Sequence, residues 1–325
     1  MPDWHDGDVA GGSSGEPRDA GGLDGACGAD PFTQVFEAHR GRLLRVAYAT
    51  LGSLSEAEDC VQEAWLRLRR VENPAAIADL GAWLTTTVSR LALDALGSAR
   101  ARRERYVGPW LPEPLVEDTH AGDPADRVTL DESVSMALLV VLERLSPAER
   151  TSFVLHEVFG LPFEEVGSVV GRSPAAVRQL AARAREHVRR GRPRFPPTAA
   201  EQRELVAAFA AACQQGDLER LVSLLDPGVV WRADGGGKVS AAHPVERGAR
   251  QVARVVLAFA RRPPRSVGLV TVNGAPGLVL RDADGVLTVL AVTVDAGRIV
   301  ALDAIRNPDK LTAVPDRGGI PPHPH

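Results

Sequence analysis

The chain has 325 residues, 44% of them hydrophobic, and a formal net charge of −4, which is typical of a globular protein with two or three domains. Its three cysteines, Cys27, Cys60 and Cys213, are far apart and lack metal-ligand spacing, so the sequence predicts neither a disulfide framework nor a metal site. No apolar run is long enough to cross a bilayer and no signal peptide is recognisable, so we expect a cytoplasmic protein without membrane contact or cofactor.

The two ends of the chain are predicted to be flexible. Residues 1–30 hold seven acids, one arginine and many glycines, and such a segment cannot bury enough apolar surface to fold. We interpret it as a disordered acidic tail, and residues 316–325 as a second flexible tail.

Residues 31–106 are predicted to form an all-helical module. Apolar side chains recur with helical period from Phe32 to Leu51. A capping box of Ser55 and Glu58 predicts the start of a second helix, and Asp79 is expected to cap a third, longer one.

Two polar surfaces of this module have alternative interpretations. The second helix exposes Asp59, Gln62 and Glu63 before a set of arginines, an order that complements the helix dipole but also suits a protein-docking surface. The third helix ends in arginines that either favour its C-terminus or contact phosphates; they include Arg100, Arg102 and Arg103.

Residues 107–128 are rich in proline and acids, so this linker is expected to run extended. Trp110 is a candidate anchor onto a folded surface, although the whole segment would also serve as a simple spacer.

The segment 129–195 contains the signals of a helix-turn-helix. Ser146 and Glu149 form a capping box, Gly171 permits the turn, and Ser173-Pro174 open the last helix. That helix leaves a polar face, and eight arginines stand against one acid between Arg172 and Arg194. This face suits the DNA major groove, and the alternative is a helical bundle with a charged exterior.

After residue 195 the pattern changes to helices plus strands. Helices are expected at 199–215, 217–225 and 247–261. Strands are expected around Val229–Trp231 and at 267–272, 277–281, 286–294 and 298–305, joined by Asn-Gly, Asp-Gly and Ala-Gly turns. We therefore predict an α+β domain over residues 199–315.

One glycine-rich loop lies in this domain, at residues 234–238. It lacks the context of a nucleotide-binding P-loop, so a hairpin or a contact loop is the better interpretation. An acid–base site built from Asp234, His243 or Asp303 is a weaker alternative.

Taken together, a bundle containing SEAEDCVQEAWLRL, an acidic linker and a helix-turn-helix resemble the bacterial sigma factors of the extracytoplasmic-function type. WLPEP, DGGGK and NPDKL look like signature motifs of the group with a fused SnoaL-like C-terminal domain. These motifs comprise Trp110, Leu111, Pro112, Glu113 and Pro114; Asp234, Gly235, Gly236, Gly237 and Lys238; and Asn307, Pro308, Asp309, Lys310 and Leu311.

The resemblance implies two all-α sigma domains followed by an α+β SnoaL-like cone, and a function in transcription initiation. Its implied partners are promoter DNA and core RNA polymerase, contacted at the clamp helices of the largest subunit and at the flap. Asp59, Gln62 and Glu63 would bind the clamp helices. The implied contacts to the −10 element and backbone are Asn73, Asp79, Trp83, Arg100, Arg102 and Arg103. Those to the −35 element are Arg172, Arg178, Gln179, Ala182 and Arg183.

Several points stay open on the sequence. Leu91 departs from the family pattern, because many relatives carry asparagine after the arginine that is Arg90 here. The acidic linker would also suit a positively charged channel of polymerase. The three signature motifs are expected to form a regulatory surface between domains, and a small ligand in the cone is unknown. Alternatives to a sigma factor are a ligand-responsive helix-turn-helix regulator that binds duplex DNA as a dimer, or a SnoaL-type enzyme on a DNA-binding module.

Overall fold

The computed structural model describes residues 31–103, 105–117, 134–191, 193, 195, 197–241, 245–260 and 266–314. Both predicted tails, linker residues 118–128 and His243 lie outside the described residues, as do the side chains of Arg100 and Arg102. None of the helices in the described part of the chain combines the length and apolarity needed to span a bilayer.

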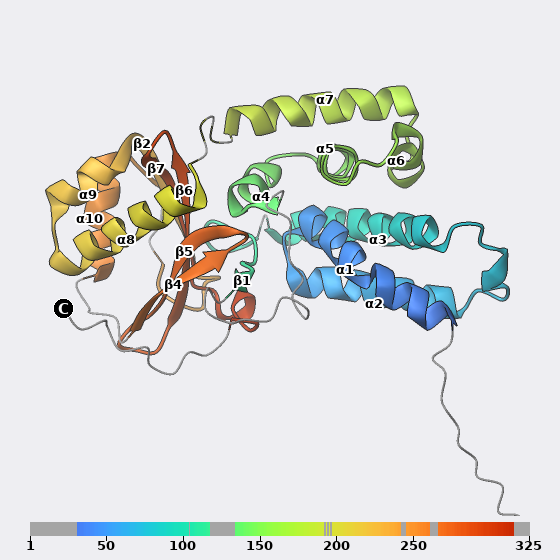
Figure 1. The fold of residues 1–325 in the computed structure, drawn as a ribbon, viewed down its shortest axis with the longest axis horizontal. Coiled ribbons are helices and arrows are strands. Elements are labelled where there is room, and N and C mark those ends of the chain that lie inside the picture. Colours follow the sequence, from blue (N-terminus) through green and yellow to red (C-terminus); the bar gives the residue numbers. More distant parts are fainter. Residues whose placement is uncertain are drawn as a thin grey trace, which may run out of the picture.

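The first module is the predicted three-helix bundle (Figure 1). It consists of α1 (Pro31–Leu51), α2 (Leu54–Arg69) and α3 (Leu80–Arg103), with a 3₁₀ turn, η1 (Pro74–Ala76), before α3. The predicted cap of α2 was wrong: Ser53, not Ser55, is the N-cap, and its side chain accepts from the backbone N–H of Glu56. The predicted cap of α3 is confirmed, because Asp79 Oδ1 accepts from the backbone N–H of Ala82 at 2.8 Å.

The second module has the predicted helix-turn-helix order. It runs through α4 (Met136–Leu142), α5 (Pro147–Phe153), a π-helical turn, η3 (Val154–Val158), α6 (Phe163–Val170) and α7 (Pro174–Gly191). The capping box of Ser146 and Glu149 is present at the start of α5. Gly171 ends α6 in the left-handed conformation, with φ of 68°, which glycine adopts without steric cost.

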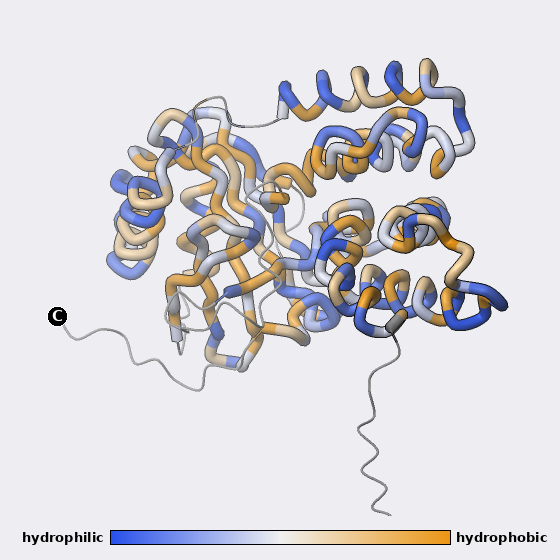
Figure 2. Tube along the Cα trace, turned by 45° about the vertical axis from the view of Figure 1, so that its right-hand side comes forward, coloured by the Kyte–Doolittle hydropathy of each residue, from blue (hydrophilic) through white to orange (hydrophobic). Residues whose placement is uncertain are grey.

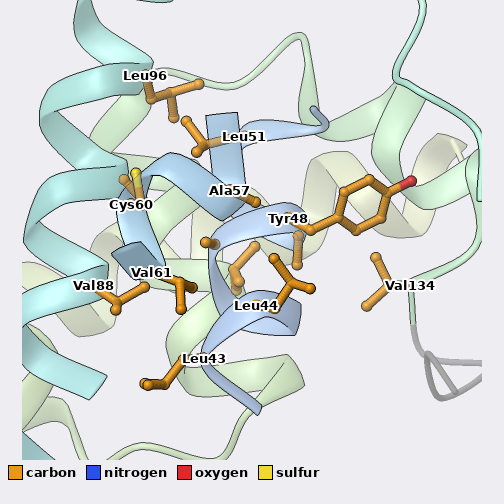
Figure 3. Close-up of a cluster of buried hydrophobic side chains, with 14 of the residues drawn as sticks. Leu43, Leu44, Tyr48, Leu51, Ala57, Cys60, Val61, Val88, Leu96 and Val134 are labelled. Carbon is orange, nitrogen blue, oxygen red and sulfur yellow. The ribbon is translucent and has the colours of Figure 1, made fainter. Parts of the chain in front are cut away.

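The two helical modules share one hydrophobic core. Buried residues of α1, α2 and α3 pack in the same cluster as residues of α4, α5 and α7, and Val134 before α4 joins them. Figure 3 shows part of this cluster, with Tyr48 of α1 near Val134 and Leu43 on the other side of the same helix. A hydrogen bond from the Arg90 guanidinium to the carbonyl of Ser168 at 2.9 Å also joins α3 to α6.

The C-terminal part is the predicted α+β domain. Its helices are α8 (Ala199–Gln215), α9 (Leu218–Leu224) and α10 (Ala249–Ala260). Its strands are β2 (Leu225–Asp234), β3 (Glu246–Arg247), β4 (Ser266–Val272), β5 (Ala275–Arg281), β6 (Leu287–Asp295) and β7 (Arg298–Ile305). Together with β1 (Val116–Glu117), the described strands form one sheet in the order β1-β4-β5-β6-β7-β2-β3, in which only the β2–β7 pair is parallel.

The two faces of this sheet have different partners. The helices α8, α9 and α10 cover one face, and Figure 2 shows apolar residues concentrated along the strands. The opposite face buries Val270, Val289 and Ile305 against Leu111 of the linker and Met136 of α4. The C-terminal domain therefore packs directly on both the linker and the second helical module.

The linker itself supplies the edge strand of the sheet. Val116 and Glu117 form β1, which pairs antiparallel with β4. The described part of the linker is extended, as predicted, but it belongs to the C-terminal sheet rather than acting as an isolated spacer.

Candidate functional site

The exposed face of α7 carries the side chains predicted to read duplex DNA. Arg178, Gln179, Ala182 and Arg183 are exposed on this helix, and Arg172 is exposed in the turn before it. The Arg178 guanidinium lies over the ring of Phe163, 4.9 Å from its centroid, and Arg183 Nε lies 3.4 Å from Glu149 Oε1. Phe163 is the first residue of α6, so α6 also orients a side chain of α7.

The net positive charge of α7 is lower than its sequence window suggests. Arg185 pairs with Glu157 of the π-helical turn, while Arg189 and Arg190 share Glu186. Glu186 is the one acid already counted in that segment, whereas Glu157, like Glu149 beside Arg183, lies on an earlier element outside it. Arg172, Arg178 and Gln179 are the residues left pointing outward without an ion pair in the described structure.

The predicted polymerase-docking residues lie together on the outside of α2. Asp59 and Gln62 are exposed, and Glu63 is partly exposed, with its Oε1 accepting from Arg67 Nε at 2.9 Å. At the other end of the bundle, Asn73 and Asp79 flank η1 and are exposed.

The residues implied to contact the −10 element differ in how exposed their side chains are. Trp83 packs partly buried against the shared helical core, so its indole is not freely presented. Arg103 is turned inward, where its guanidinium binds Glu143 of α4's C-terminal end and donates to the carbonyl of Leu51 at 2.7 Å. In this arrangement Arg103 cannot also contact a DNA phosphate, because its side chain is only 15% exposed.

The three signature motifs meet around one buried carboxylate, that of Asp234 at the end of β2. Its Oδ1 accepts from the Tyr106 hydroxyl at 2.6 Å, and its Oδ2 accepts from the backbone N–H of Leu111 at 2.9 Å. The Lys310 ammonium donates to Oδ2 at 2.7 Å. Because Asp234 is fully buried, these charge-assisted bonds replace the water that the carboxylate has lost.

Lys310 also contacts the linker directly. Its ammonium donates to the carbonyl of Leu111 and lies 3.9 Å from the centroid of the Trp110 ring. The Arg103 guanidinium covers the same indole at 3.6 Å, so Trp110 is held between two cations. Burial outweighs the attraction of Asp234 and lowers the pKa of Lys310 to about 8.

The glycines of the DGGGK loop allow this approach. At Gly236, with φ of 62°, a Cβ would come within 2.5 Å of the Asn307 amide, and at Gly237 it would meet Val107 of the linker at 3.2 Å. Asn307 in turn donates to the Tyr106 hydroxyl at 2.7 Å. A side chain at Gly236 would therefore push Asn307 away from Tyr106.

Other motif residues play smaller parts in the contact. Lys238 pairs with Asp309, but both side chains are more than half exposed, at 55% and 61%, and the pair stays within the C-terminal domain. Pro308 is exposed. Leu311 is buried together with Leu111 in the cluster on the sheet face opposite α8, α9 and α10. Pro112 and Pro114 are buried beside them.

Glu113 ties the linker to the first helical module. Its carboxylate accepts from the backbone N–H of Leu54 at 2.8 Å, at the start of α2, and its own N–H donates to the carbonyl of Gly52. Burial raises the pKa of this carboxyl, opposed by the hydrogen bonds from Leu54 and Ser53. The carbonyl of Glu113 accepts from the Tyr48 hydroxyl at 2.7 Å.

Asn273 is a junction residue that the sequence analysis missed. In the turn between β4 and β5, its amide nitrogen donates to the Tyr48 hydroxyl at 2.8 Å and lies 3.4 Å from the carbonyl of Val134. Its side-chain oxygen accepts from the backbone N–H of Leu115. One residue thus contacts α1, the linker and the start of the second module. The Asn-Gly pair was interpreted only as a turn, and Tyr48 only as part of a helix.

The proposed acid–base site does not assemble among the described residues. Asp234 is occupied as above, and Asp303 is fully buried in an ion pair with Arg232 on the neighbouring strand. His243 lies outside the described residues. No group of His, Cys, Asp or Glu side chains in the described structure has the arrangement of a metal site.

A helical bundle, a linker that is extended over its described part, and a helix-turn-helix with an exposed polar last helix form the arrangement of the sigma factor class. A family model described as Sigma-70 region 2 matches residues 35–102, and one described as Sigma-70, region 4 matches residues 135–188.

Comparison with curated relatives places the chain more narrowly. It is 45% identical over 294 residues to the ECF RNA polymerase sigma factor SigJ of Mycobacterium tuberculosis, covering 86% of this chain and 93% of the relative. It is 38% identical over 288 residues to the probable ECF RNA polymerase sigma factor SigI of the same species, covering 87% and 95%. The crystal structure of the M. tuberculosis extracytoplasmic function sigma factor SigJ matches with a TM-score of 0.72 and 41% identity, covering 86% of this chain and 98% of that chain.

The chain belongs to the ECF RNA polymerase sigma factors. It is an alternative sigma factor that binds RNA polymerase and promoter DNA and initiates transcription. Its relatives are sigma factors, which are not enzymes.

Proposed function

We propose that the C-terminal domain restrains this sigma factor in cis by holding its two DNA-binding modules together. The observation that carries the proposal is the linker, which is bound on one side by Tyr48 and Leu54 of the first module and on the other by Asp234 and Asn273 of the C-terminal domain. Met136 of the second module packs on the same sheet face.

The spacing between the two promoter elements explains why this contact would restrain the protein. Elements centred at −35 and −10 are separated by about 25 base pairs, or roughly 85 Å at about 3.4 Å per pair. Here α3 and α6 touch through Arg90 and Ser168, and both modules share one core. The surfaces of α3 and α7 therefore cannot engage both elements until the modules separate.

The individual contacts to polymerase and DNA are part of the same proposal. Asp59, Gln62 and Glu63 bind the clamp helices of the largest subunit, and the second module binds the flap. Arg172, Arg178, Gln179, Ala182 and Arg183 read the −35 element. The −10 element meets the exposed surface around Asn73 and Asp79, while Trp83, Arg100, Arg102 and Arg103 join only after rearrangement. This assignment is supported by exposure in the closed arrangement, in which the two helical modules pack together. The clamp-helix residues, the −35 residues, and Asn73 and Asp79 are all exposed there, Glu63 only partly.

We further propose that the C-terminal domain acts by contact rather than by catalysis. Asp234 and Asp303, the carboxylates available for acid–base work, are both buried in ion pairs. Tethering makes the contact intramolecular, so even a weak interface is largely occupied. Since its partner is polymerase, the protein would act in the cytoplasm.

A distance measurement tests the restraint. Donor and acceptor dyes would be placed at the exposed positions Glu72 and Ala175, in a chain whose Cys27 and Cys213 are replaced by serine. Cys60 is buried, and burial together with Glu56 and Asp59 raises its pKa to about 11, so it should resist labelling. We expect one high-transfer state in the free chain and a low-transfer state with core polymerase and promoter; the same transfer in both would contradict the restraint.

A further inference from the structure

A cavity of about 340 Å³ lies where α3, the linker and the α4–α5 turn meet. Cationic, acidic, aromatic and apolar side chains line it, among them Leu96, Arg103, Trp110, Glu143, Arg144 and Arg150. None of the contacts derived above for DNA or polymerase uses Arg144 or Arg150. The cavity thus adds Arg144 and Arg150 to the junction residues Arg103 and Trp110 described above.

The cavity carries more positive than negative charge. Glu143 is its one acid among the lining residues, and its carboxylate is shared by the guanidinium groups of Arg103 and Arg150. Arg144 adds a third guanidinium, which is exposed. Among the lining residues one carboxylate faces three guanidinium groups. Glu56 acts on Arg103 from outside the lining, and Lys310 on the Trp110 ring adds a further cation, so the excess of positive charge remains and favours a bound anion.

Arg150 shows that the available protein groups do not satisfy this site. Its side chain is 1% exposed, and while Nη1 binds Glu143, neither Nε nor Nη2 has a hydrogen-bond partner among the described residues. Buried donors left without partners cost free energy, and a guanidinium fork matches the oxygens of a tetrahedral anion. Gly52 keeps this space open, because a Cβ there would lie 3.2 Å from Nη2 of Arg150 and 3.3 Å from the Trp110 ring.

The indole at the cavity wall narrows the class of ligand. Arg103 covers the Trp110 ring at 3.6 Å and Lys310 at 3.9 Å, so the ring is already in contact with two cations. A nucleobase would have to displace a cation in order to stack on it. A compact oxyanion needs only the guanidinium groups.

We propose that this cavity binds a phosphate-class oxyanion, either inorganic pyrophosphate or the phosphate end of a larger molecule, between Arg103, Arg144 and Arg150. Such a ligand would contact the first module through Arg103 and the second module through Arg144 and Arg150 at once. It would therefore favour the closed arrangement, with Glu143 competing for the same arginines.

Isothermal titration of the full chain with pyrophosphate, at constant ionic strength, tests the proposal. We expect saturable binding with one site per chain. Arg144→Gln should weaken it at least about tenfold, because the variant removes a charge-assisted hydrogen bond to the anion. The matched control is Arg254→Gln, an exposed arginine of α10, which should leave the affinity unchanged.

A second variant changes the affinity in the opposite direction. Glu143→Gln removes the competing carboxylate and should tighten pyrophosphate binding several-fold, whereas a residue with a purely structural role would weaken it or leave it unchanged. Titration with ATP separates the two sources of the ligand: tighter binding than pyrophosphate indicates the phosphate end of a nucleotide, and equal binding indicates the phosphate groups alone.

Absence of saturable binding by millimolar pyrophosphate, or equal losses in Arg144→Gln and Arg254→Gln, would overturn the proposal. Because the assay contains neither polymerase nor DNA, its failure would leave the proposed restraint of the sigma modules untouched.

Discussion

Replacing Asp234 by alanine should release the linker from the C-terminal domain. The substitution leaves the Lys310 ammonium, which is 11% exposed, without its carboxylate, and also removes the acceptor for Tyr106 and for the Leu111 N–H. Removing one partner of a buried ion pair costs about 3–5 kcal/mol. At about 1.4 kcal/mol per factor of ten, the opening equilibrium of this segment should rise at least about 100-fold.

Hydrogen exchange of the backbone amides in residues 106–117 measures this opening, because local exchange follows the free energy of the local opening reaction. The matched control is Asp309→Ala, which removes the Lys238 pair whose side chains are 55% and 61% exposed. An exposed pair contributes at most about 1 kcal/mol, so exchange should accelerate less than about tenfold. Equal exchange in the two variants would refute the assignment of Asp234 as the centre of the interdomain contact.

Three further predictions follow from the junction and from α7. The pKa of Lys310 falls from 10.5 to about 8 on folding, so between these pH values the unfolded chain binds one more proton than the folded chain. The free energy of unfolding should therefore rise as the pH increases from 8 towards 10. Urea titrations should show a smaller rise in Lys310→Met. Tyr48→Phe leaves the carbonyl of Glu113 without this donor and the Asn273 amide without its 2.8 Å acceptor, which should cost about 1–3 kcal/mol; an unchanged thermal midpoint would argue against it. Arg178→Ala should weaken transcription from promoters that depend on −35 readout by about 1–3 kcal/mol, and equal losses on every template would indicate a folding role instead.

Local signals in the sequence predicted most of the elements. The capping box at Ser146 and the glycine at Gly171 placed the helix-turn-helix, since caps and left-handed glycines act over a few residues. Period-two runs and Asn-Gly or Asp-Gly turns placed the strands from β4 to β7. The α2 cap was misassigned because Ser53 and Ser55 both precede acids at capping distance.

The contacts between modules were less predictable, because they join residues distant in the sequence. The bond from Asn273 to Tyr48 spans 225 positions, and nothing in either neighbourhood signals it. The linker contains Val116 and Glu117 as an edge strand, yet two residues carry no detectable strand period. The resemblance implied a DNA contact for Arg103, and its place at the end of a helix was compatible with that, whereas Glu143 and Trp110 hold its side chain inside.

The relation between the three motifs came from the resemblance to a family, because hydrophobic periodicity does not link distant segments. It singled out WLPEP, DGGGK and NPDKL as related, and the structure brings Leu111, Asp234 and Lys310 from these motifs into direct contact. Their regulatory role stays a prediction.

Single-round transcription with purified core polymerase tests the central claim most directly. It would compare the intact chain with Asp234→Ala and Asp309→Ala at equal occupancy of the core enzyme, on a template carrying both promoter elements. If the C-terminal domain restrains the modules, Asp234→Ala should yield several-fold more transcript from the same start site, while Asp309→Ala matches the intact chain. Identical transcript from all three proteins would contradict the account.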